Sequence, residues 1–567
     1  MNLVSFLKKV EELNSSIAEL RLKAFIMEYA RVLEEEKREA FLAMFESFEK
    51  DPIEIHEQNT NGDDSDFRDL QEKLQEIQDE KRILICEINE DYDDWRDDDE
   101  DLKEFIDKDN VIEIVYDAMS FIHGRLDQER YEDAYEIVKL LSELKVRIEG
   151  DYYWDEEYID LKGLRSERVF GDSYERSVAE AGYVAYQCNK MADRPIKIYD
   201  LLEKLAYRDV TLENILQAGY RKLEDIDQFI LKWIEFLCER SGNDSKRYLK
   251  EAYQMLDDRN MKANYAKKYA ENHPELFDML IEDVNDDQEK IELGLSAMDL
   301  IPLDRKIRSK IALSCSKNAE EAGDIRIRNK FYAEAFYSNT NSVNYLRCRL
   351  KLEDFNDYRK SFREYYQKLN KYQKQNNYVY RDEVNSLNSV EYYTICFFDE
   401  RFEEVISYEM KQKSYLGWSS TFMKQGLALF LMLLYQGSEL TMPICKMVTM
   451  FSNPVSFVKE YFIEDEIAED SVELVWDLFM RWKSDVVLDE KKREEWLRKI
   501  RLIIRNRTQA ILGGNYRNYY WECAAYISAY GDVIESMNLG RRKDLILIYL
   551  KEYPRHSNFH HLMKQYL

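Results

Sequence analysis

Proline and glycine are scarce in this sequence, which has only 7 prolines and 17 glycines among 567 residues. Soluble proteins contain about 5% proline and about 7% glycine, so residues that form turns or break helices are strongly depleted. Folds rich in β-strands need frequent turn residues, and parallel α/β folds need apolar β-branched runs that end at glycine. Neither pattern recurs along the chain. The sequence therefore predicts an all-α protein.

Paired cysteines and metal-binding histidines are also lacking. The eight cysteines are at least 33 residues apart, so we expect buried thiols in a cytoplasmic protein. Among the six histidines only His556, His560 and His561 cluster. Ser557 is a candidate N-cap that would leave His556 outside the following helix and spoil the ligand geometry. We expect no metal and no other cofactor.

Segments for secretion or for crossing a membrane are not predicted either. Lys8, Lys9 and Glu11 stand where a signal peptide would need an apolar core. The longest apolar run, Leu427 to Tyr435, is about half of the roughly 20 residues that span a bilayer. We interpret this run as a helix that is buried on all sides, and we expect no membrane contact.

Motifs for catalysis are missing as well. The sequence has neither the Gly-x-Ser-x-Gly turn that presents a nucleophilic serine nor the glycine-rich phosphate loop that ends in Gly-Lys-Ser/Thr. Gly513-Gly514 has no third glycine in register and is typical of a turn between helices. Carboxylate pairs are uninformative among 112 acidic residues. We therefore expect no catalytic residues and no enzyme activity.

Charge is unevenly distributed along the chain. The formal charge is −30, but residues 489–567 hold 15 basic and 9 acidic residues, which gives +6 here and −36 elsewhere. Ordinary variation of a protein surface is one interpretation, and a basic module that contacts phosphate or an acidic partner is the other. The candidate contacts are Arg501, Arg505, Arg507, Arg517, Arg541, Arg542, Lys543 and Arg555.

The densest acidic run lies at residues 90–101. It is not a calcium-binding EF-hand loop, because the sixth position is Arg96 or Asp98 where glycine is required. A solvated acidic turn is one interpretation, and a docking site for a basic partner is the other. The candidate docking residues are Asp93, Asp94, Asp97, Asp98, Asp99, Glu100 and Asp101.

Apolar residues recur at helical spacing along most of the chain, and helical periodicity is also expected from Phe67 to Glu90. Two helices are expected within Val111 to Ile148, and similar pairs fit 196–241, 245–281, 300–336 and 342–378. Stacked pairs predict an irregular α-solenoid that resembles tetratricopeptide or HEAT arrays. The expected organisation is a helical pair at 1–50, a polar linker at 51–66, arrays at 67–300 and 301–488, and a basic helical module at 489–567.

The last segment carries the most specific motifs. Gly-Gly-x-x-Arg-x-Tyr-Tyr begins at Gly513, Cys-Ala-Ala begins at Cys523, and Tyr-Pro-Arg-x-Ser-x-Phe-His begins at Tyr553. This combination resembles the C-terminal end of bacterial SWIM zinc-finger proteins, and residues 333–352 are similar to a helical-repeat part of that family. The resemblance implies a helical-repeat scaffold. The zinc motif of the family, Cys-x-Cys followed by Cys-x-His, is not in this sequence.

Three functions are compatible with these patterns. The first is a noncatalytic helical scaffold or adaptor that binds a protein partner in a bacterial intracellular complex. The second is an accessory factor that contacts nucleic acid through the basic C-terminal module. The third is a regulated inhibitor or substrate subunit of a prokaryotic defence system.

Overall fold

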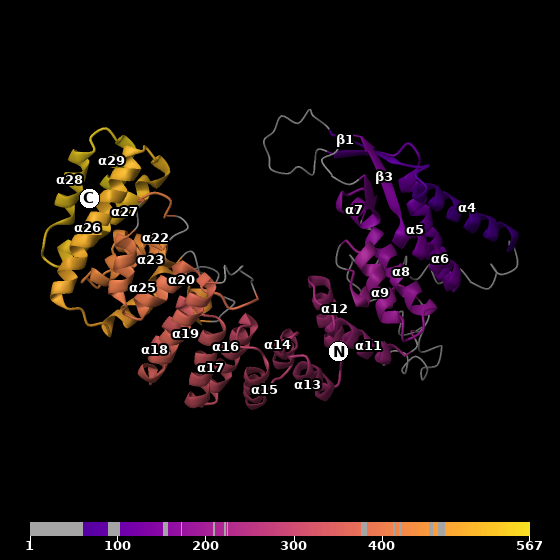
Figure 1. Ribbon diagram of the computed structural model, residues 1–567, viewed down its shortest axis with the longest axis horizontal. Helices are drawn as coiled ribbons and strands as arrows, with labels where there is room; N and C mark the ends of the chain where they lie inside the picture. The colour runs from indigo at the N-terminus through magenta and orange to yellow at the C-terminus, as the bar shows by residue number, and fades with distance from the viewer. Residues whose placement is uncertain are drawn as a thin grey trace, which may run out of the picture. The chain divides into compact units, whose positions relative to one another are not determined.

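The chain is mostly helical in a computed structural model (Figure 1). Contacts divide it into two compact units, Met1–Lys262 and Ala263–Leu567, and the boundary falls within helix α13 (Arg259–Lys268). The structure describes residues 60–88, 103–150, 157–171, 173–207, 210–219, 223, 225–375, 383–411, 414–418, 422–452, 457–462 and 471–567.

The first unit contains a small mixed sheet. Its strands are β1 (Leu84–Ile88), β2 (Lys103–Ile106), β3 (Lys145–Gly150) and β4 (Tyr158–Asp160), and their order in space is β2-β1-β3-β4. Strand β1 pairs antiparallel with β2 and parallel with β3, and β3 pairs antiparallel with β4. Helices α5 and α6 lie between β2 and β3 in the sequence, within the long crossover that a parallel strand pair requires.

Helices pack around this sheet and continue beyond it. Helix α4 contacts α5, α6 and β3, α8 contacts α5, α6 and α9, and α11 contacts α9 and α12. The bounds of the helices are α4 (Thr60–Gln78), α5 (Val111–Asp127), α6 (Tyr131–Glu143), α7 (Leu161–Ser166), α8 (Ser173–Cys188), α9 (Arg194–Leu205), α10 (Leu212–Gln217), α11 (Ile226–Cys238) and α12 (Asn243–Gln254).

The sheet corrects the sequence prediction at two places. Helical periodicity was expected as far as Glu90, but α4 ends at Gln78 and β1 follows. The predicted pair at 111–148 forms as α5 and α6, and its last residues belong to β3. Buried positions alternate in these strands, as at Leu84 and Cys86. Over five residues this period of two cannot be separated from a helical period.

Helices account for nearly all of the described part of the second unit. Those from α15 to α18 each pack against the next, and α19 packs against α17 and α20 (Figure 1). The bounds are α14 (Glu275–Glu282), α15 (Asp287–Leu300), α16 (Lys306–Glu321), α17 (Ile325–Ser338), α18 (Ser342–Lys351), α19 (Phe355–Gln375), α20 (Ser389–Phe398), α21 (Phe402–Met410), α22 (Met423–Leu434), α23 (Met442–Ser452), α24 (Phe457–Phe462), α25 (Val472–Ser484), α26 (Glu490–Gly513), the 3-10 helix η5 (Arg517–Tyr519), α27 (Tyr520–Ser536), α28 (Arg542–Glu552) and α29 (Ser557–Lys564).

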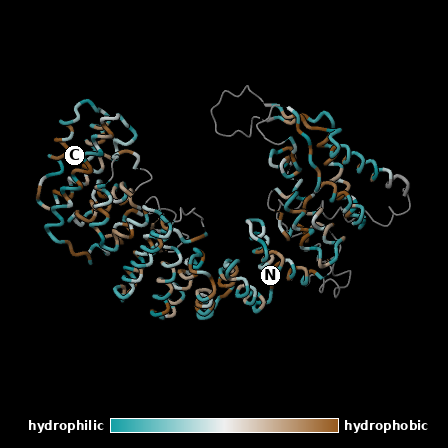
Figure 2. Tube along the Cα trace, viewed as in Figure 1, coloured by the Kyte–Doolittle hydropathy of each residue, from teal (hydrophilic) through white to brown (hydrophobic). Residues whose placement is uncertain are grey.

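Helix α22 is enclosed in the hydrophobic core of this unit. Every residue from Gln425 to Leu434 is buried, which confirms that the longest apolar run forms an enclosed helix. Helices α20, α21, α23, α26 and α27 all contact α22. Hydrophobic and hydrophilic residues interchange along most of the other helices, because each has one side in the core and one in solvent (Figure 2).

The observed boundaries differ from the expected ones. One continuous core extends from Tyr332 to Tyr566, so residues 489–567 share their core with the preceding helices. The division at Lys262 and Ala263 falls inside the array expected at 67–300. Residues 60–66 belong to α4 and not to a linker. The helical pair expected at 1–50 lies outside the described residues.

No helix in the described ranges is long and apolar enough to cross a membrane.

Candidate functional site

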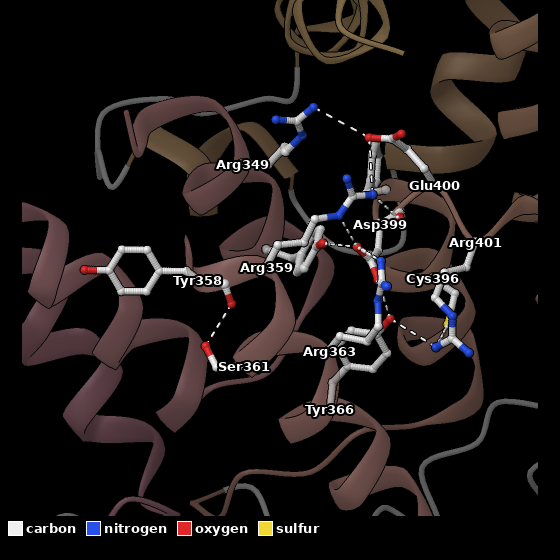
Figure 3. Close-up of polar contacts among 12 residues, drawn as sticks. Arg349, Tyr358, Arg359, Ser361, Arg363, Tyr366, Cys396, Asp399, Glu400 and Arg401 are labelled. Atoms are coloured by element: carbon white, nitrogen blue, oxygen red, sulfur yellow. Dashed lines mark hydrogen bonds and ion pairs between the residues drawn. The ribbon is translucent and has the colours of Figure 1, made fainter. Parts of the chain in front are cut away.

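One buried carboxylate organises the polar contacts among helices α18 to α21 (Figure 3). Asp399 follows the last residue of α20, and its side chain is fully buried. Its Oδ1 accepts hydrogen bonds from Tyr345 Oη and from Arg359 Nε, both at 2.8 Å. Its Oδ2 accepts from Arg363 Nε at 2.6 Å and from Tyr366 Oη at 2.9 Å. These five residues form the Asp399 cluster.

The spacing of residues on α19 explains the geometry of the Asp399 cluster. Arg359, Arg363 and Tyr366 are four and three residues apart, so they project from one face of that helix. The chain turns sharply after Asp399, because Glu400 adopts a left-handed conformation with φ of 63° before α21 begins. The turn brings the end of α20 against the polar face of α19.

Electrostatics keep this carboxylate ionised. Burial by itself would raise the pKa of Asp399, but hydrogen bonds from Arg363, Arg359 and Tyr345 outweigh it, and the pKa lies below the ordinary value of 3.8. The hydrogen bond to Asp399 in turn raises the pKa of Arg363. Because the carboxylate is enclosed and both oxygens are occupied, it is not accessible to a substrate. The Asp399 cluster holds helices together.

A second buried ion pair joins the C-terminal helices. Arg507 on α26 donates from Nη2 and Nε to Glu522 Oε1 on α27, at 2.8 and 3.0 Å. Its Nη1 donates to the carbonyl oxygen of Tyr415, and its guanidinium lies 4.4 Å from the ring centroid of Trp418. The Arg507 side chain is only 2% exposed. The sequence-based assignment of Arg507 to phosphate or partner contact is therefore wrong, because the side chain is enclosed and already neutralised.

The other predicted basic residues lie on the surface at different places. Arg542 is half-buried, and its Nη1 donates to Asp532 Oδ1 at 2.5 Å. Arg541, the N-cap residue of α28, binds Asp544 in the first turn of that helix at 2.8 Å. The remaining five are exposed: Arg501 and Arg505 on α26, Arg517 on η5, Lys543 on α28, and Arg555 before α29. The structure therefore brings only Arg501 and Arg505 together on one helix face. The acidic residues 93–101 lie outside the described residues.

The histidines and cysteines form no site in the described part of the chain. No group of three or more metal-ligating side chains comes together there. His556 precedes α29, as expected, but Ser557 is the first helical residue and not the N-cap. His560 Nε2 lies 2.9 Å from the carbonyl oxygen of Tyr553. All eight cysteines are described, none forms a disulfide, and six are buried.

A further buried carboxylate differs from Asp399 because it has no donors. Glu409 on α21 is fully buried, and neither of its carboxylate oxygens has a hydrogen-bond partner among the described residues. Its Oε1 lies against Gly426 on α22, where an added Cβ would collide with it. Burial raises the pKa of Glu409 well above the ordinary value of 4.5 and favours the protonated form.

Sequence reasoning missed Asp399, Glu409 and the apolar residues that stay exposed near the C-terminus. The Arg359, Arg363 and Tyr366 spacing marks a polar helix face, but nothing in the sequence identifies its acidic partner among 112 acidic residues. Residues 545–550 are all apolar. This run could have indicated exposed apolar side chains, because a helix that packs on one side only cannot bury residues on every side.

Neither a known protein family nor any curated protein matches this sequence.

Replacing Asp399 by asparagine removes the anionic partner of Arg363 and leaves Arg359 paired only with Glu400. We expect Asp399→Asn to lower the free energy of unfolding by about 3 kcal/mol or more in urea denaturation followed by tryptophan fluorescence. The matched control is Glu364→Gln on α19, whose side chain is 68% exposed and pairs weakly with Lys360 at 4.0 Å. It should change stability by about 0.5 kcal/mol or less. Equal effects of the two substitutions would contradict the assignment.

The Asp399 cluster also predicts a pH dependence. The folded pKa of Asp399 is below 3.8, so the stability that it contributes is present above pH 3.8 and is lost as the pH falls through the folded value. Asp399→Asn should therefore remove part of the acid sensitivity that urea denaturation shows below about pH 4.

Glu409 should behave in the opposite way. Its folded pKa lies above 4.5, so its contribution to stability falls as the pH rises from 4.5 through the folded value. We expect Glu409→Met to stabilise the protein by about 1 kcal/mol or more, with a gain that is larger at pH 8 than at pH 5. The control is Glu403→Gln on the same helix, whose side chain is 51% exposed. A gain that does not depend on pH would refute the burial of a protonated carboxyl.

Proposed function

We propose that this protein is a noncatalytic helical scaffold that binds a protein partner. The observation that carries the proposal is a contrast between buried charges and exposed apolar groups in the second unit. Its buried carboxylates, such as Asp399 and Glu522, are enclosed between helices, where they hold structure and cannot meet a substrate. Large apolar side chains, such as Ile548, remain exposed. Exposed apolar patches on charged surfaces mark interaction sites.

The order of helix contacts supports a repeat-like scaffold. Helices α15 to α18 contact their sequence neighbours, as do α26, α27 and α28. Stacking of successive antiparallel helices in the manner of tetratricopeptide or HEAT arrays presents long surfaces to partners. The segment that resembles SWIM zinc-finger proteins, residues 513–560, runs from the end of α26 into α29, and its helical content supports the proposal. Eight cysteines without a disulfide support a cytoplasmic setting for the complex.

The partner can be tested directly. We expect the full chain, tagged and expressed from its own promoter, to co-purify with a second protein in a fixed molar ratio that survives nuclease treatment. The matched variants Ile548→Asp and Ile325→Asp, both at exposed positions, separate a specific surface from general adhesion. Recovery of the chain alone as a monomer, by sedimentation velocity and by mass spectrometry of the eluate, would refute the scaffold function.

A second candidate function is contact with nucleic acid at the turn between α26 and α27. Three aromatic side chains there, Tyr516, Tyr519 and Trp521, are at least 40% exposed and flank the exposed Arg517. Lys424 Nζ lies 5.3 Å from the ring centroid of Trp521. Aromatic rings beside cations are a known platform for stacking unpaired bases.

The salt dependence of the binding affinity tests this second candidate function. A 20-nucleotide single strand should bind the full chain with an affinity that falls steeply as salt increases, because phosphate contacts release counterions. Trp521→Ala should weaken binding about tenfold or more, whereas Tyr372→Ala, at an exposed aromatic on α19, should not. The full chain is required because α27 shares its core with α22 and α23. Binding that is absent, or unaffected by salt, would exclude this function.

A further inference from the structure

Helix α28 has more apolar surface than its neighbours cover. Residues 545–550 read Leu-Ile-Leu-Ile-Tyr-Leu and occupy all sides of one and a half helical turns. The helix packs against α27 and α29, and Leu545, Ile546 and Tyr549 are buried there. Leu547 and Ile548 remain 40% and 56% exposed. Leu547 and Ile548 therefore face solvent, although α28 packs against a helix on each of two sides.

Helix α26 presents an exposed leucine beside this pair. Arg505 Nη2 on α26 lies 3.8 Å from Glu552 Oε1 on α28, so the exposed faces of the two helices adjoin. Arg507 near the end of α26 binds Glu522 near the start of α27, and Arg542 at the start of α28 binds Asp532 near the end of α27. Both helices therefore run antiparallel to α27 and parallel to each other. One turn back from Arg505 lies Leu502, which is 46% exposed.

The parallel arrangement places Leu502 level with Ile548. Ile548 lies one turn back from Glu552, just as Leu502 lies one turn back from Arg505. Burial raises the pKa of Tyr549, and Arg501 and Arg505 both lie close enough to oppose that rise, which places Tyr549 beside this part of α26. Leu502, Leu547 and Ile548 therefore lie at one level on the exposed sides of the two helices, and we call this aliphatic strip the α26–α28 face.

Cations flank the α26–α28 face. Arg498, Arg501 and Arg505 follow the exposed side of α26, and Lys543 and Lys551 lie on the exposed side of α28. The acidic residues that reach solvent on the two helices are Glu490, Glu494, Glu495, Asp544 and Glu552. Of these, Glu495 binds Lys499, Asp544 binds Arg541 and Glu552 binds Arg505. Residues 496–531 contain six basic residues and one acidic residue, Glu522, which is buried. The face is aliphatic at its centre and positive at its rim.

From this pattern we propose that the α26–α28 face binds an acidic amphipathic helix of a protein partner, an inference that rests on the proposed scaffold function. The apolar stripe of that helix packs on Leu502, Leu547 and Ile548, across the exposed sides of the two parallel helices. Its acidic flanks meet Arg498, Arg501 and Lys551. The strip extends across two helices and along about one turn of each. A partner helix that crosses both would contact it with apolar residues at positions i, i+3 or i+4, and i+7.

A protein helix fits this face better than a polynucleotide does. Aliphatic side chains offer no ring on which bases stack, and their burial needs apolar groups from the partner. The rest of the chain carries −36, which repels a long polyanion that extends beyond the basic rim. A short acidic segment places all of its few charges beside the cations of the face and does not extend onto the acidic surface beyond them.

Site-specific photocrosslinking tests the occupant. A p-benzoylphenylalanine side chain in place of Leu547 is introduced into the full chain in its native cells, and the captured segment is mapped by mass spectrometry. The control position is Ile325 on α17, which is similarly exposed at 45%. We expect capture from position 547 only, insensitivity to nuclease, and a captured segment that is acidic with apolar residues at helical spacing.

A synthetic peptide of the captured segment then measures the chemistry of binding. Its dissociation constant should rise about tenfold or more for Ile548→Asp, because a charge replaces a central apolar anchor. Arg501→Glu should weaken binding by a smaller factor that shrinks at high salt. The controls Ile325→Asp on α17 and Lys360→Glu on α19 should stay within about twofold. Unchanged urea denaturation midpoints establish that each variant is folded.

The remaining outcomes separate this inference from the proposed function. Capture from position 325 and not from 547 retains a protein partner but overturns the α26–α28 face as its site. A captured segment that is basic or neutral, a second copy of this chain, or a nuclease-sensitive product also overturns the inference. If no partner is captured at either position and none co-purifies, the scaffold function fails and the inference fails with it.

Discussion

The second unit depends on the burial of α22 on every side. A helix that is apolar around its whole circumference cannot face water on any side without losing about 25 cal/mol for each Å² left exposed. Helices α20, α21, α23, α26 and α27 all contact it, and they come from both sides of α22 in the sequence. Because α22 must be enclosed, residues 489–567 belong to the same core as residues 332–488.

Buried ion pairs connect the helices around this core at a small number of positions. Asp399 binds side chains from α18 and α19, and Glu522 binds Arg507 across α26 and α27. A buried charge is tolerated only when donors replace the water that it loses, and both carboxylates meet this condition. Glu409 shows the alternative, because a buried carboxyl without donors is driven toward its neutral form.

The division between buried charges and exposed apolar groups bears on function. Ionisable groups that are enclosed between helices, such as Asp399 and Glu522, cannot reach a substrate, whereas exposed side chains can reach a partner. On α26 and α28 these are aliphatic side chains surrounded by cations, on a chain that is otherwise strongly acidic. Such a local inversion of charge selects partners by sign and directs their approach.

The sequence by itself determined the predominance of helices and the enclosure of Leu427 to Tyr435, because both follow from composition and from apolar spacing within one helix. It did not reveal the four-stranded sheet, because strands of three to six residues are too short to show a distinct period. Nor did it separate Arg507 from Arg501 and Arg505. All three belong to one basic helix, and only the packing of α27 decides that Arg507 points into the core against Glu522 while its neighbours remain in solvent. Which charges are buried depends on contacts between residues far apart in sequence, and local patterns carry no record of those contacts.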